Sequence, residues 1–417
     1  MKYAVLNFCK ETATGRGGNL QIVMEQKDDY IFSVTEGQIG IKYGRQRPKK
    51  YEAPMSEWES FMQMKIDAGF LLYSDKKLEK KEIEIVQNSD GNSYKSIDNP
   101  DVKQIVENLL LYAQKCMEEN FKISVVDIPE PMIEKGKEIL EDLAKNYENM
   151  SLAVFNNKLK ALFMSMPRRI PDINKVLAKR PADFNDILAK EQDLFDIMIS
   201  QVRQGKMAVT TSQTILEAFG ITIESCTKEE KDAIKKMMRS EGNRFINAWR
   251  VKNLATEKRF NEFCAKEGFE IKEDLENTKN VTHLFHRSRN ENFWSIITNG
   301  LTINPTGVVI TGKAYGNGTY FAPDACKSVG YTSRRGAKWT SGGSDVGYMG
   351  IYKVATGVRY NGSRGCNSRL NWEELQRIHP GAHCTWAECR YSGFMMDEVI
   401  VYRDEQSTIE FLVQIGI

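Results

Sequence analysis

The chain lacks most of the features that mark membrane or secreted proteins. None of the apolar runs in its 417 residues approaches the ~20 residues that a membrane-spanning helix needs. Its eight cysteines are scattered and include no CxxC pair, so reduced thiols in an intracellular protein are the simplest interpretation. The N-terminus is too polar after Phe8 for a secretory signal. We expect a soluble intracellular protein without a membrane partner, nuclear in a eukaryote and in the cytoplasm or nucleoid of a bacterium.

Net charge and histidine are also scarce. The formal net charge is +2, so any surface that binds nucleic acid must be local. There are four histidines, and all lie in the last third of the chain. Together with two nearby cysteines they raise the alternative of a zinc site, with candidate ligands His283, His286, His379, His383, Cys384 and Cys389. However, Pro380 and Gly381 separate His379 from His383 and do not hold the helical face that such a pair requires. No metal is therefore expected.

Hydrophobic periodicity divides the chain into three regions. Residues 1–95 alternate short β-like runs with turns, then continue into a helical run and a polar linker. Residues 96–213 place apolar residues at helical spacing in several successive runs. Residues 214–417 mix strand-like runs with short helices. The predicted fold is multidomain: a small α+β N-terminal domain with its linker, an all-α helical bundle and a C-terminal α+β domain.

A basic segment lies in the first region, between residues 42 and 50, and contains no acidic residue. Basic side chains beside aromatic rings suit the neutralisation of phosphates and stacking on exposed bases. A solvated hairpin is the alternative. The candidate DNA-binding residues are Tyr43, Arg45, Arg47, Lys49 and Lys50.

Residues 283–331 gather groups that few structural needs would place together. A histidine beside an arginine-flanked serine is followed by a glycine-rich bend, two tyrosines and a serine. The bend, with Gly312, Gly316 and Gly318, fits neither the GxGxxG fingerprint nor a P-loop. By itself it indicates a tight turn before a strand. Singly, the tyrosines would be core residues and the histidine a structural one.

Taken in order, the motifs of the last region resemble the catalytic domain of poly(ADP-ribose) polymerases. Residues 96–213 look like the helical regulatory domain that precedes this catalytic domain in DNA-dependent members. Residues 41–45 resemble the start of a WGR domain, with Tyr43 in place of the usual tryptophan. The catalytic motifs are His286-Arg287-Ser288-Arg289, Gly300-Leu301, Gly316-Asn317-Gly318-Thr319-Tyr320-Phe321-Ala322, Lys327-Ser328-Val329-Gly330-Tyr331 and Asp397-Glu398-Val399-Ile400-Val401-Tyr402.

The resemblance implies a catalytic triad of His286, Tyr320 and Glu398. His286 would hold a ribose hydroxyl of NAD, and Glu398 would stabilise the oxocarbenium-like ribose and orient the acceptor hydroxyl. Two tyrosines would sandwich the nicotinamide ring, while Ser328 and the backbone of Arg287, which stands where the family has glycine, would bind the carboxamide. The NAD-binding residues implied in this way are His286, Arg287, Ser288, Tyr320, Lys327, Ser328 and Tyr331.

The function implied is that of a DNA-responsive poly(ADP-ribose) polymerase of the DNA damage response. It would transfer ADP-ribose from NAD to protein side chains, its own included, and elongate the polymer with release of nicotinamide. NAD is the substrate, and no metal takes part. DNA strand breaks would engage residues 1–95, and the helical domain (96–213) would restrict NAD access to the ADP-ribosyltransferase domain (214–417) until then. Two alternatives remain open: a mono-ADP-ribosyltransferase, and a DNA-binding scaffold with an inactive transferase fold.

Overall fold

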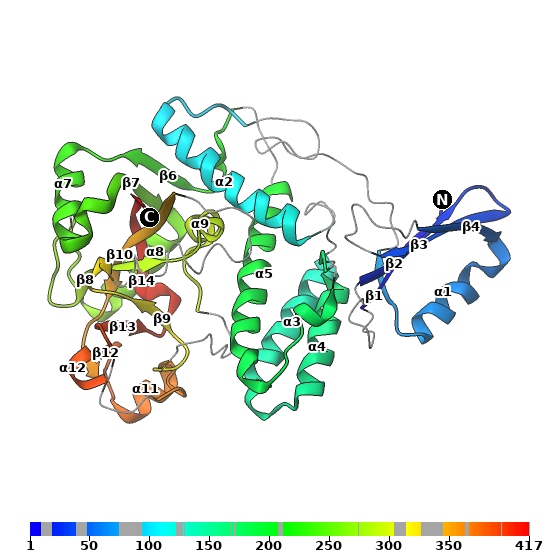
Figure 1. Ribbon diagram of the computed structural model, residues 1–417. Coiled ribbons are helices and arrows are strands. Elements are labelled where there is room, and N and C mark those ends of the chain that lie inside the picture. The colour runs from blue at the N-terminus through cyan, green and yellow to red at the C-terminus, as the bar shows by residue number, and fades with distance from the viewer. Residues whose placement is uncertain are drawn as a thin grey trace. The chain divides into compact units, whose positions relative to one another are not determined.

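The chain divides into two compact units. Residues 1–83 and 117–205 form the first unit, and residues 84–116 and 206–417 form the second. The predicted mixture of helices and sheets is confirmed (Figure 1), whereas the domain boundaries at 95/96 and 213/214 stay a prediction. The computed structural model describes residues 1–9, 19–38, 48–74, 94–121, 128, 130–166, 168–170, 172–206, 212–273, 275–303, 314–326, 345–362, 367–392 and 394–416.

An antiparallel five-stranded sheet opens the first unit, in the order β4-β3-β2-β1-β5. Helix α1 (Trp58–Asp67) packs on this sheet through Trp58, whose ring lies edge-on to Phe32 at 5.0 Å between centroids. Period-2 alternation of apolar residues produces the buried face that α1 covers. The strands are β1 (Tyr3–Cys9), β2 (Asn19–Gln26), β3 (Ile31–Gln38), β4 (Lys49–Pro54) and β5 (Leu71–Ser74).

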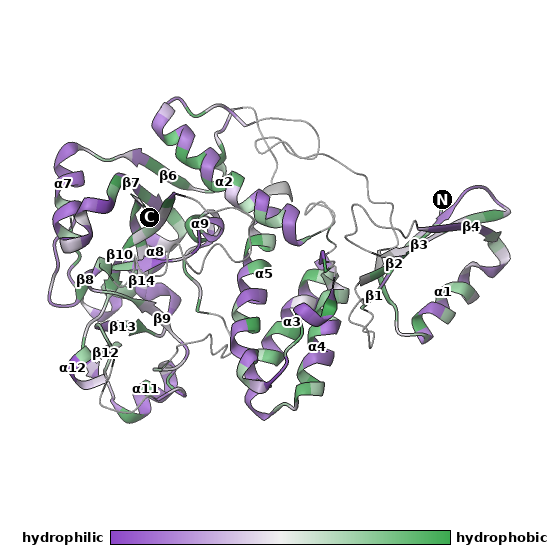
Figure 2. Ribbon diagram, in the orientation of Figure 1, coloured by the Kyte–Doolittle hydropathy of each residue, from purple (hydrophilic) through white to green (hydrophobic). Residues whose placement is uncertain are grey.

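Amphipathic helices make up the rest of the first unit, and Figure 2 shows both polar and apolar residues along each of them. The predicted spacing of apolar residues holds in α4, where Phe155 and Leu159 are fully buried. Phe155 stacks on Phe184 of α5 with 3.8 Å between ring centroids. Arg168 and Glu191 form an ion pair in which both side chains are buried. The helices are α3 (Glu130–Asn146), α4 (Leu152–Ser165) and α5 (Phe184–Lys206).

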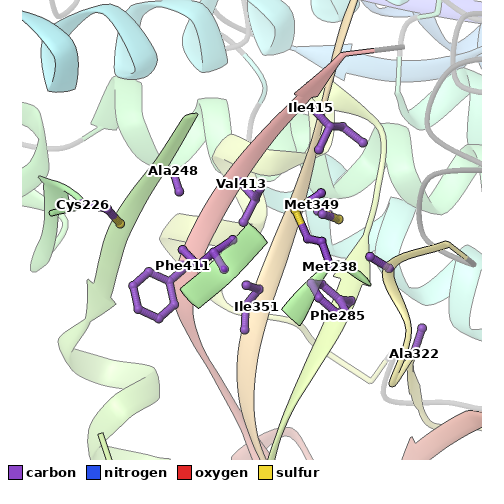
Figure 3. Packing of buried hydrophobic residues seen from close by; sticks show 12 residues of the cluster. Cys226, Met238, Ala248, Phe285, Ala322, Met349, Ile351, Phe411, Val413 and Ile415 are labelled. Carbon is purple, nitrogen blue, oxygen red and sulfur yellow. The ribbon is translucent and has the colours of Figure 1, made fainter. Parts of the chain in front are cut away.

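The second unit is built on a five-stranded antiparallel sheet in the order β6-β7-β14-β10-β8. One face carries an apolar cluster that includes Met349, Ile351 and Val413 from the central strands and Phe285 from the edge strand, as Figure 3 shows. Helix α7 (Lys228–Met237) begins at a capping box formed by Thr227 and Glu230. The strands are β6 (Ile221–Ser225), β7 (Phe245–Asn253), β8 (Val281–Arg287), β10 (Val346–Ala355) and β14 (Ser407–Gly416).

A smaller sheet in the order β11-β12-β13-β9 completes the second unit. It joins the larger sheet at one antiparallel bridge, where Phe285 of β8 and Ala322 exchange two backbone hydrogen bonds of 2.8 and 2.9 Å. The two sheets therefore part beside the last residues of β8. The smaller sheet and the helices near it comprise β9 (Thr319–Phe321), β11 (Arg359–Asn361), β12 (Cys384–Ala387), β13 (Glu398–Val401), α8 (Leu254–Glu267), α9 (Phe293–Asn299) and α11 (Trp372–Ile378).

Helix α2 (Pro100–Asn120) contributes its residues up to 116 to the second unit. The predicted cap is present, because the side chain of Asn99 accepts from the backbone N–H of Asp101. The Asp101 carboxylate in turn accepts from Ser225 at 2.6 Å, the indole of Trp249 at 2.9 Å and Asn247 at 3.1 Å. The first turn of α2 is therefore anchored to β6 and β7. In the described parts of the chain, no helix combines the length and apolar character needed to cross a bilayer.

Candidate active site

Three neighbouring strands carry the three predicted catalytic residues. β8 ends with His286 and Arg287, β9 holds Tyr320 at its centre, and β13 begins with Glu398. β13 pairs with β9, placing Ile400 opposite Tyr320, and β9 meets β8 at the Phe285–Ala322 bridge. With strands about 4.8 Å apart, the backbones of β8 and β13 lie roughly 10 Å from each other.

His286 is held as a neutral hydrogen-bonding group. Its Nδ1 lies 2.9 Å from the carbonyl oxygen of Tyr320, and because a carbonyl only accepts, Nδ1 carries the proton. Burial lowers the pKa of His286 to about 4, outweighing the hydrogen bond to Tyr320, and the charge of Arg287 lowers it further. The imidazole is therefore neutral at pH 7. Its Nε2 offers a lone pair that can accept a hydrogen bond from a hydroxyl.

Aromatic rings surround the imidazole. The ring centroid of Phe321 lies 5.6 Å from that of His286, and the ring of Tyr352 lies 5.9 Å away, both edge-on. Phe321 and Tyr352 also contact each other at 5.5 Å. Sequence reasoning missed both residues as parts of this site. Their side chains reach His286 only because β8, β9 and β10 are brought together, which no local motif indicates.

The glycine bend positions Tyr320. The Tyr320 hydroxyl accepts from the backbone N–H of Tyr315 at 3.0 Å and donates to the carbonyl of Gly316 at 3.1 Å. Gly316 has a φ of 74°, and an added Cβ there would lie 2.0 Å from the carbonyl oxygen of Leu370. A Cβ at Gly318 would lie 2.5 Å from the Ile400 side chain. The bend is the predicted tight turn before a strand, and its glycines allow the close approach to β13.

Glu398 starts β13 directly after a fixed carboxylate. Asp397 accepts from the backbone N–H of Cys389 at 2.9 Å and from the indole of Trp386 at 3.3 Å. Burial alone would raise the pKa of Asp397, but these hydrogen bonds outweigh it and hold the pKa below its usual range. The backbone that enters Glu398 is thus held by β12 and the segment after it. Glu398 itself is partly exposed.

The remaining predicted NAD-binding residues fall partly outside the described residues, since Lys327, Ser328 and Tyr331 lie there. Arg287 pairs with Met349 in extended backbone. Among the described non-glycine residues only Arg239 and Leu275 have a positive φ, so Arg287 in place of glycine creates no backbone strain. The side chain of Ser288 accepts from Asn292 at 2.9 Å.

His283, three residues before His286, has a different environment. Its Nε2 lies 2.7 Å from a carboxylate oxygen of Glu410, and its Nδ1 lies 3.2 Å from the side-chain oxygen of Asn277. Glu410 also pairs with Arg250 at 3.2 Å and with Lys353 at 3.5 Å. His283 therefore belongs to a buried charge network. In the parts of the chain that the structure describes, no group of three or more His, Cys, Asp or Glu side chains could hold a metal ion.

Of the predicted DNA-binding residues, Lys49 and Lys50 lie on β4, the exposed edge strand of the first sheet, while Tyr43, Arg45 and Arg47 fall outside the described residues. Lys49 is directly opposite Glu36, whose carboxylate accepts from Lys65 at 2.8 Å. Lys50 is opposite Thr35. The charge of Lys50 is therefore compensated less than that of Lys49.

Comparison with known proteins bears on the second unit. Residues 222–362 match the model of the family described as "Poly(ADP-ribose) polymerase catalytic domain". This stretch includes His286 and Tyr320 and ends before Glu398. It supports an ADP-ribosyltransferase activity that uses NAD as substrate.

Individual relatives match a similar portion of the chain. The poly [ADP-ribose] polymerase-like protein 100L of Invertebrate iridescent virus 6 is 29% identical over 180 residues, which cover 42% of this chain and 87% of that protein. Protein 101L of the same virus, described as uncharacterized, is 19% identical over 198 residues, 47% of this chain and 78% of that protein. Poly [ADP-ribose] polymerase 2 of Arabidopsis thaliana is 26% identical over 165 residues, 34% of this chain and 25% of that protein.

Proposed function

We propose, from a catalytic-domain match that contains His286 and Tyr320, that the chain transfers ADP-ribose from NAD to protein side chains. The observation that carries the proposal is the state of His286. A neutral imidazole with Nδ1 bound to the Tyr320 carbonyl presents Nε2 as an acceptor, and a ribose hydroxyl is the donor that fits it. Glu398 begins a strand two positions across from β8 and supplies the second polar group.

The reaction breaks the bond between nicotinamide and the ribose anomeric carbon. The electron pair of that bond returns to the ring nitrogen, so nicotinamide leaves as a neutral molecule while positive charge develops on the ribose. The carboxylate of Glu398 stabilises that charge and takes the proton of an acceptor hydroxyl as its oxygen bonds to the anomeric carbon. His286 and Glu398 act here as residues that orient and stabilise. No covalent intermediate with the protein is needed.

The product is proposed to be a polymer. A carboxylate that takes the proton from an acceptor hydroxyl serves a protein side chain and the ribose of a growing chain equally well. By the resemblance, a glutamate at the position of Glu398 goes with chain elongation, whereas members that lack it tend to add single units. The sequence resemblance supports Arg287, Ser288, Lys327, Ser328 and Tyr331 as further NAD-binding residues.

DNA is the proposed activator, through the basic segment of the first unit. The exposed edge strand β4 presents Lys50 opposite the neutral Thr35, an arrangement that suits contact with a phosphate. Lys49 faces Glu36 and is expected to contribute less. Strand breaks are the form of DNA that the resemblance implies.

The test is incubation of the full chain with labelled NAD, with and without nicked DNA, followed by a denaturing gel. Ladders that need nicked DNA support the full proposal. One discrete labelled band supports mono-transfer, and no label supports the scaffold with an inactive fold. Glu398→Gln should lower product formation by about a hundredfold or more, because it removes the charge that stabilises the ribose. Glu388→Gln, at a surface carboxylate paired with Arg390 at 2.6 Å, is the matched control and should leave the ladders unchanged.

A further inference from the structure

The imidazole of His286 needs more than its hydrogen bond to keep one orientation. The bond from Nδ1 to the Tyr320 carbonyl holds one atom of the ring, and rotation about that bond would still swing Nε2. The walls that limit this rotation are the rings of Phe321 and Tyr352, which meet the imidazole at interplanar angles of 62° and 81°. The packing of these two rings therefore sets the orientation of the imidazole.

The place of the Tyr352 ring is set by a glycine. Gly350 lies directly opposite His286 in the β8–β10 pairing, and Tyr352 is two residues further along β10, on the same face. A Cβ at Gly350 would lie 2.4 Å from Cε2 of Tyr352, 3.1 Å from Cζ and 3.2 Å from the hydroxyl oxygen. The far end of the Tyr352 ring therefore occupies the space beside His286 that a side chain at residue 350 would fill.

The Tyr352 hydroxyl adds nothing to stability that the structure shows. Tyr352 is 1% exposed, and its hydroxyl has no hydrogen-bond partner among the described residues. A buried hydroxyl without a partner lowers stability, because it loses its hydrogen bonds to water. Burial also raises the pKa of Tyr352 far above its usual value, so the group stays neutral. The ring, and not a charge or a hydrogen bond, is what Tyr352 supplies to its neighbour.

We propose that Tyr352 is a positioning residue: its ring, lying over Gly350, holds the plane of the His286 imidazole so that Nε2 faces the substrate ribose. The catalytic consequence rests on the proposed function. The geometric claim concerns two side chains and can be tested without turnover. Tyr352 itself is not proposed to touch the substrate.

The test compares Tyr352→Leu, Tyr352→Phe and Gly350→Ala in the full chain, with Tyr348→Leu as the matched control. Tyr348 is on the same strand and face, is equally buried, and packs on Phe293 and Tyr112 instead of His286. The first readout is the titration of the His286 imidazole by NMR, with its signal identified by its loss in His286→Gln. The second is the pH profile of kcat/KM for NAD.

In Tyr352→Leu, the His286 pKa should rise from about 4 toward its ordinary 6.5, because the loss of the ring lets water reach the imidazole. Gly350→Ala, which displaces the ring without changing residue 352, should shift it in the same direction. kcat/KM should fall about tenfold at pH 7, and more steeply below pH 7 than in the wild type. Tyr352→Phe should keep the wild-type titration and kcat/KM within about twofold, with equal or greater thermal stability.

The proposal is overturned if the His286 pKa stays near 4 in Tyr352→Leu and Gly350→Ala, or if Tyr348→Leu shifts it as much. It is also overturned if Tyr352→Phe behaves like Tyr352→Leu, since the hydroxyl would then be the active group. If one variant does not fold, the other decides. Wild-type protein that fails to consume NAD would refute the proposed function, while the titration would still decide whether Tyr352 holds His286.

Discussion

Two histidines three residues apart on β8 are used in opposite ways. His283 lies among Glu410, Lys353 and Arg250, where each charge has a partner. His286 lies between Phe321 and Tyr352, where burial holds its pKa at about 4. Both side chains are on the same strand. The neighbouring strands, and not the residue type, decide whether a histidine supports the fold or serves chemistry.

The contrast shows that one strand can carry both a residue that stabilises the fold and a residue that serves the reaction. Near its start, β8 is held through His283 to β14, which carries Glu410, and this tie fixes the strand in the sheet. At its end, β8 still pairs with β10, where Arg287 lies opposite Met349, and Phe285 also forms a bridge with Ala322 directly after β9. The charged tie gives rigidity where no ligand is needed. The aromatic rings beside His286 keep its imidazole neutral, so that Nε2 can accept a hydrogen bond from a hydroxyl.

The largest effect is expected from removing the centre of the charge network. Glu410→Gln should lower the free energy of unfolding by about 2–3 kcal/mol, because Arg250, Lys353 and His283 lose a buried, hydrogen-bonded carboxylate. Arg250 keeps its pair with Glu230, and Lys353 keeps its pair with Glu273. Urea denaturation of the full chain measures it. The exposed Glu374→Gln, which breaks an ion pair with Arg377, should cost under about 1 kcal/mol. Equal losses in the two variants would mean that the network contributes no more than a surface pair.

Single replacements of His283 and His286 by glutamine should show that one histidine affects stability and the other affects activity. His286→Gln should lower NAD turnover about a hundredfold and leave unfolding nearly unchanged, since its acceptor atom serves the substrate. His283→Gln should lower the free energy of unfolding by about 1.5–3 kcal/mol through the loss of the bond to Glu410, with turnover of the folded protein within about twofold. If the two variants lost stability and turnover to the same extent, His283 and His286 would not differ in role.

Removal of the Asp101 carboxylate, which accepts hydrogen bonds from neutral donors, should have an intermediate effect on the free energy of unfolding. Asp101 accepts from Ser225, Asn247 and Trp249. Asp101→Asn should cost about 1.5 kcal/mol, less than Glu410→Gln, because no buried cation loses a partner. Hydrogen exchange of the α2 amides should rise in this variant. A loss as large as that of Glu410→Gln would show that charge pairing is not what sets the network apart.

The smallest effect is the pH dependence that His286 contributes. An unfolded histidine titrates near pH 6.5 and the folded one near 4, so between these values the unfolded state binds more protons. Protonation of the unfolded state therefore lowers stability as the pH falls below 6.5, by about 1 kcal/mol at pH 5.5. Asp196, whose pKa burial raises to about 7, titrates in the same range with the opposite sign and is present in both proteins. The unfolding free energy of the wild type minus that of His286→Gln should therefore fall by about 1 kcal/mol between about pH 7.5 and about pH 5.5.

Local features could be predicted from the sequence. Thr227 and Glu230 form the expected capping box, with hydrogen bonds of 2.7 and 3.2 Å, because both partners lie within one turn. The glycine bend was predicted as a tight turn before the strand of Tyr320, and the structure confirms it. These features depend on neighbours three or four residues away, which a sequence displays directly.

Long-range partners could not be predicted. Glu410 follows His283 by 127 residues, and Tyr352 follows His286 by 66. Neither pair has a spacing that a helix or a hairpin would enforce. The sequence does not show that His283 and His286 have such different surroundings, because these depend on how the strands pair.

The sequence by itself determined the capping box of α7, the cap of α2 and the order of motifs around His286, Tyr320 and Glu398. Only the tertiary structure decided that His283 is paired with a carboxylate and that the imidazole of His286 packs against the rings of Phe321 and Tyr352. The physical reason is that solvation and charge depend on what lies within a few ångströms in space. Those neighbours are set by sheet pairing across the whole of the second unit.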